Sequence, residues 1–331
     1  MELVQLGKSS LKVTPIAFGA WAVGGWMWGG AEETQSLRAI RAAYDHGMTT
    51  IDTAPVYGFG RSEELVAKAL QGVPRDKYQI LTKFGMNWET EQGDYFFDTT
   101  DNNGNPIRMF KYSGKKKVRK ECEESLRRLR TDYIDLLQIH WPDTTTPIAE
   151  SMGEVARLIE EGKVRAAGVC NYSAAQVREA LHSVNVVSNQ VPYSMVNREI
   201  EKEVIPQALE AGIGILPYSP LQRGLLSGKI SRDHKFSEGD TRSGNRFYQP
   251  ENIDAVNNML QKFKPIAQKH NATLSQLVLN WTTRRPAIAC VLAGARDEHQ
   301  VKQNIESLSF TLSDEDLALM TKAADSLKLS L

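Results

Sequence analysis

Four polar residues of complementary acid–base character lie at or just beyond the ends of short apolar runs. Asp52, Lys83 and His140 each close such a run, and Tyr57 follows Asp52 by five residues. If the runs are parallel strands of one sheet, their carboxyl ends bring a carboxylate, an ammonium, an imidazole and a phenol into one cleft. This set predicts proton transfer to a carbonyl oxygen, and therefore chemistry rather than binding alone.

The four side chains suggest a division of labour. A free tyrosine has a pKa of about 10, too high for easy proton transfer at neutral pH, and a nearby ammonium such as Lys83 lowers it. Asp52 would hold Lys83 charged, and His140 would donate a hydrogen bond to the substrate oxygen. Any one of these residues alone is more often structural. Because three of them end consecutive predicted strands, we favour the catalytic interpretation. None can deliver a hydride, so a cofactor must.

Apolar runs alternate with helical patterns along the whole chain. The alternation predicts a closed (β/α)8 TIM barrel, and the missing Gly-x-Gly-x-x-Gly after the first strand weakens the alternative of an open doubly wound sheet. We expect strands to start near residues 15, 50, 79, 134, 166, 186, 214 and 288, and helices over 34–45, 115–129, 148–161, 173–182, 200–211, 252–270, 273–284 and 298–306.

Three connections carry further expectations. Residues 2–14 are predicted to form an N-terminal β-hairpin before the barrel. The long loops 84–114 and 222–250 follow strand ends, so both are expected at the C-terminal face as lids, binding loops or disordered segments. The run Gly24–Gly30 is too rich in glycine for a helix or strand and is expected to be a loop on the same face. No linker divides the chain, which predicts a single domain over 1–331.

The bulk composition excludes several functional classes. Forty Lys and Arg balance forty Asp and Glu, which gives no general electrostatic attraction for nucleic acid or an anionic membrane. No apolar stretch approaches the roughly 20 residues that span a bilayer. The first residues lack the pattern of a signal peptide. The three cysteines, Cys122, Cys170 and Cys290, suggest neither a disulfide framework nor a metal site, so we expect a cytoplasmic protein without a metal.

Many short segments, in order, resemble the aldo-keto reductase superfamily. The similarity extends over nearly the whole chain and is greatest to bacterial members linked to inositol and sugars and to the potassium-channel β subunits. It implies a (β/α)8 barrel that reduces carbonyls with NADPH, with Asp52, Tyr57, Lys83 and His140 as catalytic residues and Tyr57 as proton donor. The matching segments are 19–21, 51–58, 81–83, 132–141, 162–172, Gln190, 218–221 and 294–304.

The resemblance also implies where the cofactor binds. Asn171 and Gln190 would hold the nicotinamide carboxamide, Tyr218 would stack on the ring, and the turn 219–224 would hold the pyrophosphate, with Arg223 either on a phosphate or simply solvated. Arg296 would meet the 2′-phosphate and favour NADPH. Cys170 and Gln300 depart from the commoner Ser and Arg. The implied cofactor residues are Trp21, Asp52, Cys170, Asn171, Gln190, Tyr218, Ser219, Leu221, Arg223, Gly294, Arg296, Gln300 and Asn304.

The substrate and the class of activity are less constrained by the sequence. Indole rings stack on apolar rings and on the C–H faces of sugars, so a polar aldehyde or monosaccharide, and hence carbohydrate metabolism, is expected. A slow redox-sensing subunit that binds NADPH is the alternative. A metal hydrolase using Asp52 and His140 is disfavoured because no His-x-His pair occurs. The expected substrate contacts are Trp21, Tyr57, Trp88, His140 and Trp141, with Trp28 as a further candidate.

Overall fold

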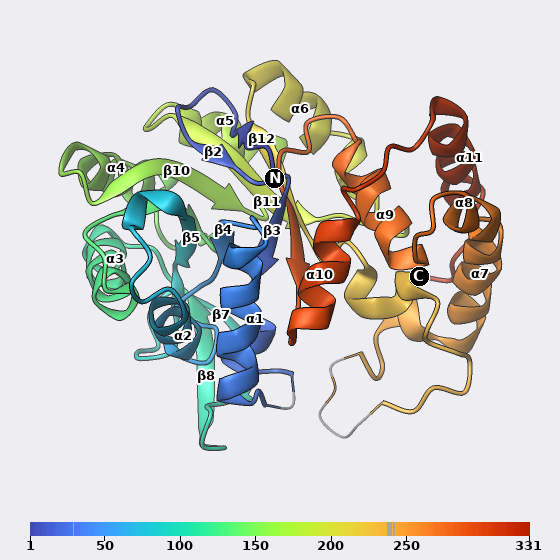
Figure 1. Cartoon of the computed structure of the whole chain (residues 1–331). Coiled ribbons are helices and arrows are strands. Elements are labelled where there is room, and N and C mark those ends of the chain that lie inside the picture. Colours follow the sequence, from blue (N-terminus) through green and yellow to red (C-terminus); the bar gives the residue numbers. More distant parts are fainter. Residues whose placement is uncertain (29, 237–239, 241) are drawn as a thin grey trace.

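Eight parallel strands form the centre of the molecule, and helices surround them (Figure 1). The computed structural model describes residues 1–28, 30–236, 240 and 242–331. The strand order is β12-β11-β10-β9-β5-β4-β3-β13. A bridge between Ile215 and Ile288 brings the two ends of this order together, which confirms the predicted (β/α)8 barrel. The strands are β3 (Ile16–Gly19), β4 (Thr50–Asp52), β5 (Gln79–Phe84), β9 (Ile134–Ile139), β10 (Val164–Cys170), β11 (Val186–Pro192), β12 (Gly214–Tyr218) and β13 (Val291–Gly294).

Most of the described helices follow the strands along the chain and pack on the outside of the barrel, while α7, α8 and α11 lie beyond α9 at one side (Figure 1). Leu81, Leu136 and Leu216 fill the barrel interior, while a second layer of apolar side chains lies between strands and helices. Both faces of each strand are therefore buried, as their nearly continuous apolar sequences predict. The helices are α1 (Glu33–Asp45), α2 (Arg61–Ala69), α3 (Lys115–Leu129), α4 (Ile148–Glu160), α5 (Ala174–Leu181), α6 (Val204–Ala211), α7 (Pro250–Gln261), α8 (Lys264–Lys269), α9 (Leu274–Thr283), α10 (Glu298–Glu306) and α11 (Asp314–Asp325).

Some elements differ from the sequence prediction. Helices α2 and α11 were not predicted, and the helix expected over 252–270 is two helices, α7 and α8. The break falls just before Pro265, which has no N–H to continue the hydrogen-bond ladder of α7. The last barrel strand starts at Val291, three residues later than expected, and Ile288 forms only the isolated bridge.

The N-terminal hairpin forms as predicted, from β1 (Val4–Gln5) and β2 (Lys12–Val13). The loop 84–114 is instead a three-stranded antiparallel sheet of β6 (Met86–Asn87), β7 (Asp94–Thr100) and β8 (Pro106–Lys111). The second long loop contains two short 3₁₀ helices, Gln222–Ser227 and Arg246–Tyr248. Its residues 237–239 and 241, and Gly29 of the glycine-rich loop, lie outside the described residues. No helix in the described part of the chain is long and apolar enough to cross a membrane.

Candidate active site

The four residues singled out by the sequence meet at the C-terminal end of the barrel. Lys83 is fully buried, and its Nζ lies 2.7 Å from Asp52 Oδ1, 2.9 Å from the carbonyl oxygen of Thr53 and 3.3 Å from Tyr57 Oη. The ring of His140 stands edge-on to the ring of Tyr57, with centroids 5.7 Å apart. Register explains the meeting, because β4 pairs directly with β5 and β5 with β9.

Two glycines allow the loop that carries Tyr57 to approach the loop after β3. A Cβ on Gly58 would lie 2.2 Å from the carbonyl oxygen of Gly24, and a Cβ on Gly24 would lie 2.6 Å from that of Tyr57. Gly58 also has a positive φ of 69°, which side chains rarely adopt. The contact places Trp21 beside Tyr57, with their rings stacked 6.1 Å apart. The position of Tyr57 therefore depends on backbone packing as much as on its hydrogen bond.

Burial controls the protonation of the site. It raises the pKa of Tyr57 to about 12, and the charge of Lys83 only partly offsets this rise. Burial is the largest single influence on Lys83 and alone would lower its pKa, but the charge and hydrogen bond of Asp52 together with the effects of Tyr57 and Cys170 raise that pKa above its ordinary value. Burial, then the charge of Lys83, holds the pKa of His140 well below its usual range. At neutral pH the site therefore contains a protonated phenol, an ammonium and a neutral imidazole, and the expected lowering of the tyrosine pKa is absent.

This order of protonation predicts a distinctive titration of the cofactor-free protein. In wild type we expect Tyr57 to ionise near pH 12, above the value of about 10 for exposed tyrosines. The corresponding rise in ultraviolet tyrosinate absorbance should be missing in Tyr57→Phe. The phenol must then remain a proton donor over the whole range in which the protein is handled. A difference titration of wild type against the variant measures the step. A step at or below the value for exposed tyrosines would show that Lys83 dominates.

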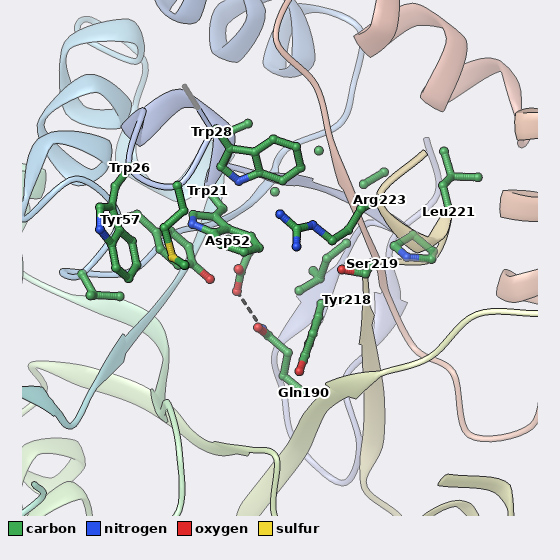
Figure 2. Close-up of a pocket in the computed structure, with 18 of the residues that line it drawn as sticks. Trp21, Trp26, Trp28, Asp52, Tyr57, Gln190, Tyr218, Ser219, Leu221 and Arg223 are labelled. Carbon is green, nitrogen blue, oxygen red and sulfur yellow. Dashed lines mark hydrogen bonds between the residues drawn. The ribbon is translucent and has the colours of Figure 1, made fainter. Parts of the chain in front are cut away.

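An elongated cavity of about 640 Å³ opens above these residues. Figure 2 shows Trp26 beside Tyr57 on one side and Ser219, Leu221 and Arg223 on the other. Between the two ends, Gln190 Nε2 donates a 2.8 Å hydrogen bond to Asp52 Oδ2, the dashed line in the figure. Both carboxylate oxygens of Asp52 are thus engaged, one by Lys83 and one by Gln190. This leaves Asp52 little capacity to serve as a metal ligand.

A connected set of polar residues surrounds the middle of the cavity. Tyr218 Oη donates to Asn171 Oδ1 at 3.0 Å, and Asn171 Nδ2 donates to the carbonyl oxygen of His140 at 3.0 Å. Asn171 adopts a positive φ of 59°, and its backbone N–H donates to the carbonyl oxygen of Gln190. These contacts hold the amide and the phenol ring in the cavity wall in a defined orientation.

The far end of the cavity is cationic and carries unused donors. The guanidinium groups of Arg223 and Arg296 each lie 5.2 Å from the ring centroid of Trp28. Arg296 also donates to the carbonyl oxygen of Trp28. The buried indole N–H groups of Trp21 and Trp28 have no hydrogen-bond partner within the described part of the chain. Two cations, two free indole donors and an amide-lined centre fit an elongated anionic cofactor such as a nicotinamide dinucleotide.

Most of the residues expected at the catalytic, cofactor and substrate sites line this cavity, but four do not. Lys83 and Cys170 are buried behind the wall. Asn304 lies on α10, where its side chain donates to the carbonyl oxygen of Gly294. Trp88 packs edge-on against Phe59, with ring centroids 5.3 Å apart. Trp88, which directly follows β6, is therefore placed beside Phe59 and outside the cavity lining where a substrate contact was expected.

Sequence reasoning missed several residues that line the cavity. The aromatic pair Phe96 and Phe97 had a visible signal, an aromatic run in a long loop after a strand end. Arg242 had none, and it reaches the wall with its guanidinium held by Asp240. The other missed lining residues are Ala22, Trp26, Met27, Val56, Met86, Leu292, Ala293 and Ala295.

Known proteins resemble this chain over almost all of its length. The Aldo/keto reductase family matches residues 15–325. An aldo-keto reductase of Bacillus subtilis is 36% identical over 321 residues, covering 96% of this chain and 91% of the relative. The NADH-specific methylglyoxal reductase of Escherichia coli is 35% identical over 333 residues, covering 99% and 100%. A solved structure, the glycerol dehydrogenase of Gluconobacter oxydans, superposes with a TM-score of 0.87 at 36% identity, covering 97% and 94%.

The family of these relatives agrees with the geometry of the site. Members of the family use a nicotinamide cofactor and act on small carbonyl substrates. The barrel, the cluster of Asp52, Tyr57, Lys83 and His140, and the elongated cavity agree with that chemistry. The chain therefore belongs to the aldo/keto reductase family of oxidoreductases.

Proposed function

We propose that this protein reduces an aldehyde or ketone to the alcohol with NADPH and that Tyr57 donates the proton. The observation that carries the proposal is the contact of the fully buried Lys83 Nζ with both Asp52 Oδ1 and Tyr57 Oη at the base of a cavity. A phenol that remains protonated and faces the cavity can donate its proton to a substrate bound there. When it has given up its proton, the adjacent ammonium stabilises the phenolate.

The reaction follows from what these side chains do. The cavity residues would hold a nicotinamide cofactor, which when bound would supply the hydride that no side chain can provide. Tyr57 donates its proton to the carbonyl oxygen, on which negative charge develops. His140, held neutral by burial and by Lys83, donates a hydrogen bond to the same oxygen and orients it. Asp52 keeps Lys83 charged and aimed at Tyr57. Neutral His140 acts as a hydrogen-bond donor and not as the acid, because it lacks the second ring proton that an imidazolium would give up and its remaining N–H is less acidic than a phenol.

The cofactor residues follow the polarity of the cavity. Asn171 and Gln190 present amides where the nicotinamide carboxamide would lie, with the ring of Tyr218 beside them. The turn 219–224 and Arg223 would hold the pyrophosphate. The left-handed backbone at Ser219 and Arg223, with φ of 55° and 50°, presents this turn to the cavity. The buried Cys170 is proposed to support the wall rather than bind cofactor directly.

Arg296 is proposed to select NADPH over NADH by pairing with the 2′-phosphate. Its side chain is available at the cavity end, next to Gln300, whose Oε1 accepts from the Arg296 N–H. Gln300, on α10, would face the adenine. Asn304, one helical turn further on, would support that end of the cavity through its bond to the carbonyl oxygen of Gly294. The methylglyoxal reductase of Escherichia coli is NADH-specific, so kinship alone does not imply a preference for NADPH, and the preference must be measured for this chain.

Removing Arg296 tests this selection. We expect Arg296→Ala to raise the Michaelis constant for NADPH about tenfold or more, because a charge-assisted contact to phosphate is lost, and to change that for NADH little. Arg223→Ala is the matched control and should weaken the binding of both NADPH and NADH, since both contain a pyrophosphate. Dissociation constants from quenching of tryptophan fluorescence provide a readout independent of turnover. Equal weakening of both cofactors by Arg296→Ala would exclude the role in selection.

A cytoplasmic enzyme on small carbonyl compounds is the function that these features support, and a slow redox sensor is the second candidate. The sensor would share the same cavity. Steady-state oxidation of NADPH with a panel of aldehydes separates the two, because a sensor binds the cofactor tightly but turns over very slowly. We expect turnover of about 1 per second or faster for at least one aldehyde, as is common for enzymes. Tight binding with only minutes-scale turnover across the panel would favour the sensor.

A further inference from the structure

The antiparallel hairpin formed by β7 and β8, here called the capping hairpin (Asp94–Lys111), is joined to three loops around the active site. Asn102 Nδ2 donates at 2.7 Å to the carbonyl oxygen of Gly58, next to Tyr57. The indole N–H of Trp26, from the loop after β3, donates at 3.3 Å to Thr99 Oγ1. The carboxylate of Asp94 accepts from the N–H and the hydroxyl of Thr144, in the loop after His140. The hairpin is thus fixed across the substrate end of the cavity.

A β-bulge turns two consecutive aromatic residues of this hairpin into the cavity. The register of β7 on β8 shifts between Tyr95 and Phe97, and both Phe96 and Phe97 line the cavity. In a regular strand, neighbouring side chains point to opposite faces, so only one of the pair would line the wall. Tyr95, immediately before them, points outward and is 51% exposed.

These two rings and two tryptophans form an aromatic slot (Trp26, Phe96, Phe97, Trp141). Trp26 and Phe97 are nearly parallel, with an interplanar angle of 15° and centroids 6.3 Å apart. Phe96 lies 5.1 Å from Trp141 and 4.8 Å from Phe97. Met86 and Met109 pack in the same cluster. The slot belongs to the same cavity as Tyr57 and His140, at the end where Trp26 lies in Figure 2.

The slot contains little hydrogen-bonding capacity. The indole N–H of Trp26 is already used by Thr99, the phenylalanines have no donor or acceptor, and Trp141 adds a single indole donor. A sugar carries a hydroxyl on almost every carbon, and each hydroxyl buried here without a partner weakens binding. A flat apolar group loses no hydrogen bonds to water when it enters the slot, and it gains stacking contacts with the parallel and edge-on rings.

We infer that the capping hairpin determines substrate specificity and selects carbonyl compounds whose carbonyl bears a flat apolar substituent. The substituent lies in the aromatic slot while the carbonyl oxygen reaches Tyr57 and His140. The inference rests on the proposed carbonyl reduction, and it replaces the sugar expected from the tryptophans of the sequence. Phe96 and Phe97 are specificity residues in this account, acting on the part of the substrate remote from the reacting bond.

The test compares two aldehydes in three hairpin variants. Benzaldehyde carries a flat apolar group, and glyceraldehyde is short and polar. We expect wild type to prefer benzaldehyde in kcat/KM, and Phe97→Ala to lower this preference about 10- to 100-fold, mainly through the benzaldehyde value. Phe97→Leu keeps apolar bulk without the flat face and should lie between. Tyr95→Ala, on the outer face of the same hairpin, is the matched control and should leave both values unchanged.

The possible outcomes separate this inference from the proposed function. A wild-type preference for glyceraldehyde, or an equal loss for both aldehydes in Phe97→Ala with an unchanged melting temperature, overturns the specificity role while carbonyl reduction stands. A wild type that reduces no aldehyde, although it binds NADPH as shown by fluorescence quenching, overturns the proposed function itself. If Phe97→Ala melts early, Phe97→Leu decides, because an unchanged preference in that folded variant also contradicts the slot.

Discussion

Replacing Tyr57 by phenylalanine is expected to lower kcat for aldehyde reduction by about a thousandfold or more, because general acid catalysis contributes about 10²–10⁴. The variant keeps the ring that stacks on Trp21 at 6.1 Å and loses only the hydroxyl. Since that hydroxyl bonds to Lys83 at 3.3 Å and is the proton source, the loss falls on the chemical step. Steady-state kinetics at saturating NADPH and aldehyde measure the effect.

Binding and folding serve as controls for this variant. The dissociation constant for NADPH should stay within about twofold, because the cationic end of the cavity and the amides near Gln190 are untouched. The melting temperature should also change little. Turnover close to that of wild type in a folded, cofactor-binding variant would remove Tyr57 from the role of acid.

The second large effect is expected at Lys83, where a buried ion pair supports both chemistry and stability. Lys83→Met leaves Asp52, 4% exposed, with its carboxylate unpaired in the interior. Removing one partner of a buried pair costs about 3–5 kcal/mol in free energy of unfolding. The proton donor also loses the ammonium that stabilises its phenolate, so kcat should fall in parallel. Urea unfolding and steady-state kinetics measure the two losses separately.

A surface pair and a double variant control this result. Lys68 pairs with Glu33 at a similar distance, 2.6 Å, but both side chains are about half exposed. Lys68→Met should therefore cost less than about 1 kcal/mol. Adding Asp52→Asn to Lys83→Met removes the unpaired charge and should restore part of the stability without restoring activity. A stable and active Lys83→Met would contradict the account of both effects.

The sequence was informative wherever the strand pattern decided the geometry. Asp52, Lys83 and His140 end neighbouring strands, and parallel pairing alone brings them together. The predicted barrel and the N-terminal hairpin are confirmed for the same reason, since apolar runs and turn residues specify them locally. The prediction of a single domain over 1–331 stays a prediction.

The sequence was less informative where long-range packing decided the outcome. The pKa of Tyr57 is set chiefly by burial. The strand pattern predicted that Lys83 lies nearby, but it did not predict how deeply the phenol is buried. The loop 84–114 was expected to be a lid, a binding loop or a disordered segment, yet it pairs as a sheet whose bulge places Phe96 and Phe97 together in the cavity. Trp88 lies in the same segment and was expected to contact substrate, but it packs beside Phe59 and outside the cavity lining.

In the proposed reaction, a carbonyl group receives hydride from the cofactor while Tyr57 supplies the proton. The most direct measurement uses NADPH carrying deuterium at the transferred position, with benzaldehyde as substrate, and mass spectrometry of the product. The account predicts an alcohol with one deuterium on its carbinol carbon from wild type and almost none of this product from Tyr57→Phe. Alcohol without deuterium on carbon, or equal labelled product from both proteins, would contradict it.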